Sequence, residues 1–142
     1  MDLPDTTPPD AESDPILLVE DDLVLAGSLE RYLRARGHGV VRAESAEGAL
    51  DLLRSGTRPS LVLLDINLPG RSGWAVLRDP AYTAAGSPPV LVATAIGIRP
   101  ETLADHPIAG YLPKPFPLPT FIDAVERIIR RQGAAPTAEE IP

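Results

Sequence analysis

Short apolar runs alternate along the chain with segments whose apolar residues recur at helical spacing. The apolar runs have the length of strands, and their nearly continuous apolar character is typical of parallel strands buried on both faces of a sheet. The predicted strands span residues 16–20, 40–43, 61–65, 90–94 and 110–112. Clear amphipathic stripes over residues 25–33, 46–53 and 118–129 predict helices between or after them.

The helices expected after the third and fourth strands are weaker. One is expected over Trp74–Arg78, cut short by Pro80, and the next is limited to the residues between Pro100 and Pro107. Proline lacks an amide hydrogen and disfavours helical geometry in the residue before it, so Pro107 should end this helix, while Pro100 is tolerated only near its start. A short or irregular fourth helix is therefore predicted.

The order of the elements predicts a (βα)₅ chain. Right-handed crossovers turn such a chain into an open parallel sheet with helices on both faces, a doubly wound α/β sandwich. One domain is expected over residues 15–132. The flanking segments, 1–14 and 133–142, are rich in proline and acidic residues and have little to bury, so both are predicted to be disordered.

Polar residues stand where the predicted strands end. The first strand runs into Glu20, Asp21 and Asp22, and the third ends at Asp65. In open parallel sheets, ligands bind beyond the carboxyl ends of the strands, at the point where the strand order reverses. Each residue alone has an ordinary explanation as a turn or capping residue. Their coincidence at the expected edge instead indicates an acidic site.

Thr94 ends the fourth strand, and Lys114 follows the fifth. Converging carboxylates repel one another, and Mg²⁺, which prefers oxygen ligands and phosphate, relieves that repulsion. Asp65 could then form an aspartyl-phosphate, a known covalent intermediate. Lys114 is the only lysine among 13 lysines and arginines, and a compact ammonium suits a small phosphoryl group. An X–Pro bond beside Lys114 is a candidate cis peptide.

At this point the chain resembles the receiver domains of two-component response regulators, of the chemotaxis-regulator-like kind. The resemblance covers residues 15 to about 131. It is carried by ILLVEDD at 16–22, LVLLDINLPGRSGW at 61–74, VLVATA at 90–95 and YLPKPF at 111–116. It implies a flavodoxin-like fold with strand order 2-1-3-4-5.

The resemblance also implies roles for residues around the acids. Glu20 and Asp21 would be the acidic pair, and Asp21 and Asp65 would bind Mg²⁺ together with the backbone carbonyl of Asn67. Asp65 would be the phosphoacceptor. The Lys114–Pro115 bond would be cis, as it usually is in the family.

Two further residues are implied to switch on activation. Thr94, with Lys114, would contact the phosphoryl group, and Tyr111 would change its rotamer as Thr94 moves. The phosphoryl donor would be a sensor histidine kinase or a histidine phosphotransfer protein, and the target an unidentified protein. No enzymatic activity is expected beyond self-catalysed phosphorylation and dephosphorylation.

Composition agrees with this class. A net charge of −7 argues against a nucleic-acid-binding surface, and no second, DNA-binding domain is expected. The chain has no cysteine, no signal-peptide pattern and no apolar run long enough to span a membrane, so a cytoplasmic location is predicted.

Two alternatives stay open. One is a receiver-fold scaffold or interaction module that is not phosphorylated. The other is a small flavodoxin-like enzyme or a phosphatase, although acids replace the phosphate-binding loop of flavin proteins and Asn67 stands where a second catalytic Asp is usual in phosphatases.

Overall fold

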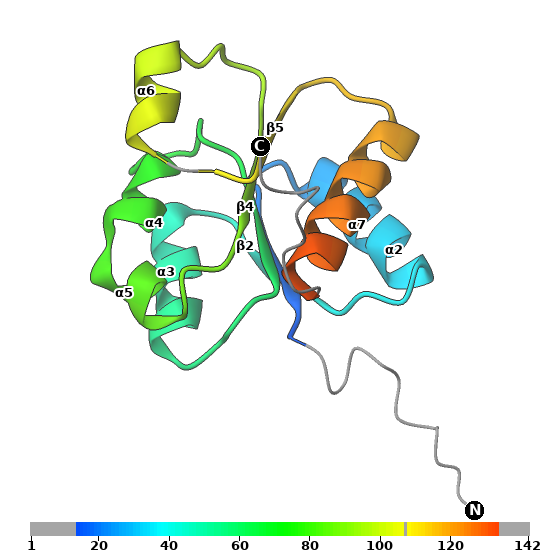
Figure 1. The fold of residues 1–142 in the computed structure, drawn as a ribbon, viewed down its shortest axis with the longest axis horizontal. Helices are drawn as coiled ribbons and strands as arrows, with labels where there is room; N and C mark the ends of the chain where they lie inside the picture. The colour runs from blue at the N-terminus through cyan, green and yellow to red at the C-terminus, as the bar shows by residue number, and fades with distance from the viewer. Residues whose placement is uncertain (1–13, 107, 134–142) are drawn as a thin grey trace, which may run out of the picture.

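Five parallel strands form the sheet at the centre of the computed structural model, which describes residues 14–106 and 108–133 (Figure 1). The strands are β1 (Ile16–Val19), β2 (Val40–Ala43), β3 (Leu61–Leu64), β4 (Val90–Thr94) and β5 (Gly110–Pro113). Their order is β2-β1-β3-β4-β5, which confirms the predicted order. The predicted tails lie outside the described residues, except for Asp14 and Gly133.

Helices cover both faces of the sheet. On one face lie α2 (Leu23–Ala35) and α7 (Leu118–Gly133); on the other lie α3 (Ala46–Arg54), α4 (Trp74–Arg78), α5 (Pro80–Ala84) and α6 (Pro100–Asp105) (Figure 1). Alternate strand residues divide between two cores, because successive side chains point to opposite faces. Leu17 and Leu64 pack in the core beneath α3, whereas Leu18 and Leu63 pack in the core beneath α2 and α7. The predicted doubly wound sandwich is thus confirmed.

The register of the central strands aligns their carboxyl ends. Val19 of β1 lies opposite Leu64 of β3, and the Asp65 amide donates to the Val19 carbonyl at 3.1 Å. Both strands therefore end one residue earlier than predicted. Glu20 and Asp65, the residues that follow them, emerge side by side at the same edge.

The connection after β3 differs from the prediction. One helix ending before Pro80 was expected, and α4 fits it, but a second helix, α5, begins at Pro80 itself. The Asp79 side chain accepts a hydrogen bond from the Ala81 amide at 2.9 Å and caps this helix. Proline is compatible with the first helical turn because the amide it lacks would have no helical partner there. Pro80 thus marks the boundary between α4 and α5.

The helix before β5 is short, as predicted. α6 has six residues, none of them buried, and Arg99 provides no side-chain hydrogen bond at its start. His106 already has extended backbone geometry, with φ −131° and ψ 95°.

No helix within the described residues is both long enough and apolar enough to cross a membrane.

These features of α6 predict that it opens more readily than the well-buried helix α3. In hydrogen exchange, the amides of Thr102 and Leu103 should exchange roughly a hundredfold faster than those of Ala49 and Leu50 in α3, since local opening costs least where few apolar contacts break. α3 is a suitable reference because it buries four residues and has a side-chain cap at Ser45. Equal protection of the two helices would contradict this expectation.

Candidate functional site

The strand ends bring three carboxylates together. Carboxylate oxygens of Glu20, Asp21 and Asp65 all lie within 4.8 Å of one another. Glu20 and Asp21 follow β1, and Asp65 follows its neighbour β3, so the aligned ends of these strands account for the cluster. The sequence prediction that these residues share one edge is confirmed by this geometry.

Burial differs sharply among the three. Glu20 is 4% and Asp65 6% exposed, whereas Asp21 is exposed. A buried carboxylate is costly unless it is paired and hydrogen-bonded, because it loses its hydration. Asp21 therefore forms the side of the site that faces solvent, and Glu20 and Asp65 need partners from the protein.

Lys114 supplies a partner to both buried acids. Its Nζ donates to Glu20 Oε1 at 2.7 Å and to Asp65 Oδ2 at 3.1 Å. Its backbone amide donates to the Thr94 carbonyl at 3.0 Å, which fixes the loop after β5 against the end of β4. The Lys114–Pro115 peptide bond is cis, as predicted.

The pKa values of Glu20 and Lys114 are both raised. Burial raises the pKa of Glu20 above its ordinary value, and the hydrogen bond from Lys114 offsets only part of that effect. For Lys114, burial lowers the pKa, but the hydrogen bonds to Glu20 and Asp65 outweigh it and leave the pKa above its ordinary value. Lys114 therefore remains a cation at neutral pH.

Asp22, the third acid after β1, has a different role from Glu20 and Asp21. Its Oδ1 accepts hydrogen bonds from the amides of Val24 and Leu25, each at 3.1 Å, so its side chain caps α2. Its own amide donates to Glu20 Oε2 at 3.1 Å and helps to orient that carboxylate. Asp21 thus belongs to the carboxylate cluster, whereas the adjacent Asp22 caps α2.

Asn67 contacts the carboxylate oxygen of Asp65 that Lys114 does not contact. Its amide donates to Asp65 Oδ1 at 3.0 Å. Asp65 therefore has one oxygen held by this amide and the other by Lys114. The clustered carboxylates of Glu20, Asp21 and Asp65 fit a hard divalent cation such as Mg²⁺, which prefers oxygen ligands and retains several waters.

Thr94 and Tyr111, the predicted switch pair, both contact the backbone of Ile96. Thr94 is fully buried, and its Oγ1 accepts from the Ile96 amide at 3.5 Å. The Tyr111 hydroxyl donates to the Ile96 carbonyl at 3.5 Å. Both hydrogen bonds are long and therefore weak. The segment after β4 is thus linked loosely to both side chains.

Gly73 is a site residue that the sequence prediction missed. A Cβ at this position would lie 2.4 Å from the Asp65 carbonyl oxygen and 2.9 Å from Ile66 Cα. The Gly73 amide donates to the Ile66 carbonyl at 2.9 Å, so the start of α4 is held directly against the backbone that carries Asp65. The segment NLPGRSGW has glycines at positions 70 and 73, and spacing alone does not reveal which one makes this close approach.

Comparisons with known proteins agree with this arrangement. Residues 16–126 match the family described as response regulator receiver domain. The curated response regulator MprA of Mycolicibacterium vanbaalenii is 37% identical over 118 residues, which cover 82% of this chain and 50% of that protein. MprA of Mycobacterium avium is 34% identical over 128 residues, or 89% of this chain and 55% of that protein. The chain thus spans about half the length of the curated relatives that it matches.

Solved structures show the same fold. The non-phosphorylated HemR receiver domain of Leptospira biflexa is 31% identical, with a TM-score of 0.75 over 88% of this chain and 99% of that chain. The response regulator TrrA of Thermotoga maritima, solved in complex with Mg²⁺ and BeF, is 27% identical, with a TM-score of 0.70 over 81% and 98% of the two chains.

The doubly wound sandwich and the acidic edge of its sheet agree with the receiver-domain class of regulatory proteins. The chain belongs to the response regulator receiver domain family, and its class of function is that of a receiver in two-component signal transduction.

The close approach at Gly73 predicts a strong effect of a single methyl group. Gly73→Ala should destabilise the fold by about 1–3 kcal/mol, because overpacking against backbone atoms cannot be relieved by a rotamer change. Amide NMR shifts should change most at Asp65 and Asn67. Urea unfolding and an amide correlation spectrum measure the two effects.

Gly27→Ala is the matched control. Gly27 lies within α2, where the nearest atom to an added Cβ is Arg42 Nη1 at 3.9 Å. Alanine is favoured over glycine inside a helix, so this variant should be as stable as the parent or more so. Equal stability of the two alanine variants would contradict the positioning role of Gly73.

Proposed function

We propose that Asp65 is the phosphoacceptor of this receiver domain, with a sensor histidine kinase or a histidine phosphotransfer protein as donor. The observation that carries the proposal is the position of Asp65. It is a buried carboxylate in contact with the chain's only lysine, and it lies beside two further acids at the carboxyl edge of the sheet.

In the proposed transfer, an oxygen of Asp65 forms a bond to phosphorus as the phosphorus–nitrogen bond of the donor phosphohistidine breaks. The leaving imidazole takes up a proton and returns to neutral histidine. Little covalent chemistry is required of the protein beyond alignment and charge stabilisation. Lys114 offers an ammonium group 3.1 Å from Asp65 Oδ2, where it can also stabilise the negative charge of the phosphoryl oxygens.

The proposed cofactor is Mg²⁺, held by Asp21, Asp65 and the backbone carbonyl of Asn67, with Glu20 completing the acidic pair. When bound, it supplies positive charge that offsets the carboxylates and the phosphoryl oxygens. Glu20 is already hydrogen-bonded to Lys114 and to the Asp22 amide, so it stabilises the site without having to approach the cation directly.

The proposed signal leaves the site through Thr94 and Tyr111. A phosphoryl group adds acceptor oxygens, which favours movement of the Thr94 hydroxyl toward Asp65. That movement breaks the weak contact between Thr94 and the Ile96 amide, and it frees the segment that also accepts from Tyr111. The target is a protein whose affinity differs between the two arrangements, because only differential binding shifts the equilibrium.

Phosphorylation provides the direct test of the proposal. Incubation with Mg²⁺ and acetyl phosphate should add one phosphoryl group to the intact chain, and hydroxylamine should remove it. Asp65→Asn should remain unlabelled because the amide is a poor nucleophile. Intact-mass analysis is the measurement. Labelling of the Asn variant would reject Asp65, whereas an unlabelled parent chain would favour a scaffold that is not phosphorylated.

Neighbouring acids should respond differently to substitution. Asp21→Ala should weaken Mg²⁺ binding by at least about tenfold, since a charged ligand is lost, with little change in the free energy of unfolding. Asp22→Ala should retain Mg²⁺ binding but destabilise the fold by about 1 kcal/mol, because α2 loses its cap. Magnesium titration and urea unfolding separate the two roles. Similar losses of Mg²⁺ affinity in both variants would refute the assignment.

A further inference from the structure

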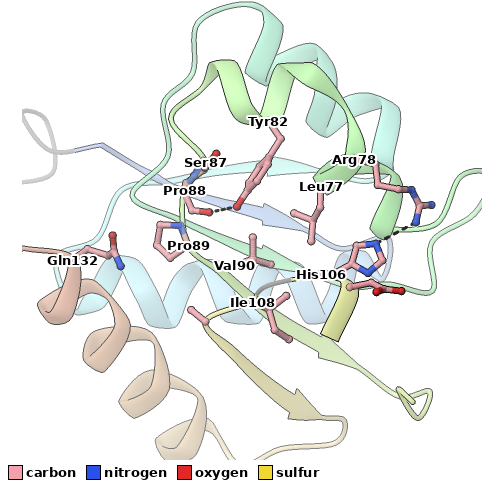
Figure 2. A pocket seen from close by; sticks show the side chains of 12 residues that line it. Leu77, Arg78, Tyr82, Ser87, Pro88, Pro89, Val90, His106, Ile108 and Gln132 are labelled. Carbon is pink, nitrogen blue, oxygen red and sulfur yellow. Dashed lines mark hydrogen bonds between the residues drawn. The ribbon is translucent and has the colours of Figure 1, made fainter. Parts of the chain in front are cut away.

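A groove of about 750 Å³ lies at the amino-terminal edge of β4, at the other end of this strand from Thr94. Val90 and Ile108 line it beside Leu77 and Tyr82, which reach it from α4 and α5 (Figure 2). Its size falls within the range of binding pockets in proteins. Nothing in the proposed phosphoryl chemistry involves this groove.

The short α6 accounts for the groove. The helix ends at Asp105, and the next described residues, His106 and Ile108, run toward β5 without helical geometry. Residues outside the helices, among them Ser87, His106 and Ile108, therefore form part of the lining. Tyr82 lines the groove, and its side chain is held in place because its hydroxyl donates a hydrogen bond to the Pro88 carbonyl.

The two ends of the groove differ in chemistry. Gln132, in the last turn of α7, lines one end, and Arg78 and His106 line the other (Figure 2). Arg78 Nη1 lies 3.3 Å from His106 Nε2, whose ring also contacts the Thr102 carbonyl through Nδ1 at 3.0 Å. Asp105 is the single acid in the lining. A guanidinium thus lies at the end remote from α7.

We propose that the segment at residues 134–142 of this same chain, AAPTAEEIP, occupies the groove. It begins two residues beyond Gln132, at the end of the groove that α7 forms. Its first residues, two alanines and a proline, match the apolar lining near Pro89 and Val90. Glu139 and Glu140 follow, and they complement Arg78 at the far end.

Reach and concentration are compatible with this occupant. Glu139 lies seven positions after Gln132, and an extended chain spans about 3.3 Å per residue, or roughly 23 Å in all. Covalent attachment gives an effective concentration on the order of millimolar, so a weak contact suffices. The segment has too little apolar surface to fold by itself, and the groove provides the surface that it lacks.

Paramagnetic relaxation tests the proposal on the full chain. The chain has no cysteine, so Thr137→Cys gives a single attachment point for a nitroxide label. We expect broadening of the amide signals of Leu77, Arg78 and His106. Arg36 and His38 are the matched references, because both contact Glu126 on the other side of α7. Equal broadening of both sets, or broadening confined to the last turn of α7, would overturn the proposal.

Charge reversal tests the pairing. Arg78→Glu should lower the docked population by roughly two- to fivefold, as expected for one exposed ion pair. Glu139→Lys with Glu140→Lys should restore it in the Arg78→Glu background. Unchanged broadening in Arg78→Glu would remove Arg78 from the proposal.

A mixture of labelled, isotopically unenriched chain with unlabelled, ¹⁵N-enriched chain distinguishes the source of the segment. Broadening in that mixture would assign the segment to a second copy and overturn docking within one chain. The outcome is independent of Asp65 phosphorylation, because all these measurements use the unphosphorylated protein.

Discussion

The repulsion between buried carboxylates is the constraint on which the site depends. Glu20 and Asp65 are nearly inaccessible to solvent, and each would be unstable as an isolated anion in the interior. One ammonium, from Lys114, contacts both. The loop after β5, which contains the cis Lys114–Pro115 bond, places this ammonium at the ends of β1 and β3. The loop and the acidic cluster therefore depend on each other. Removing Lys114 would leave two buried carboxylates without a compensating charge.

The fold prepares this arrangement through backbone alignment rather than through side-chain flexibility. Parallel pairing places the ends of β1 and β3 side by side. The Asn67 amide then donates to the Asp65 carboxylate and the Gly73 amide to the Ile66 carbonyl, which hold the loop after β3. Gly73 allows α4 to begin in contact with the backbone of Asp65, where a side chain would clash. The fold itself therefore orients the Asp65 carboxylate, which limits the reorganisation that the proposed phosphoryl transfer requires.

The region around the short α6 extends to the end of β4 that is remote from the acidic site. Beside the short α6 lie a weakly anchored segment next to Thr94 and, at the other end of β4, the groove that Val90 lines. His106 connects these regions with α4, since its ring packs against Trp74 with centroids 4.5 Å apart and contacts Arg78. His106, which follows α6, thus links it to the helix that starts beside the Asp65 backbone.

The sequence by itself determined the strands and the helices other than α5, the strand order through the resemblance, and the residues at the strand ends. Strands buried on both faces need continuous apolar runs, and strand-end acids such as Glu20 and Asp65 interrupt them visibly. Only the tertiary structure decided that Lys114 contacts both Glu20 and Asp65, that Asp22 caps α2, and that Gly73 touches the Asp65 backbone. It also showed that Pro80 begins a helix instead of only ending one. These facts depend on distances between segments far apart in the chain or on local cap geometry, and neither periodicity nor residue spacing encodes them.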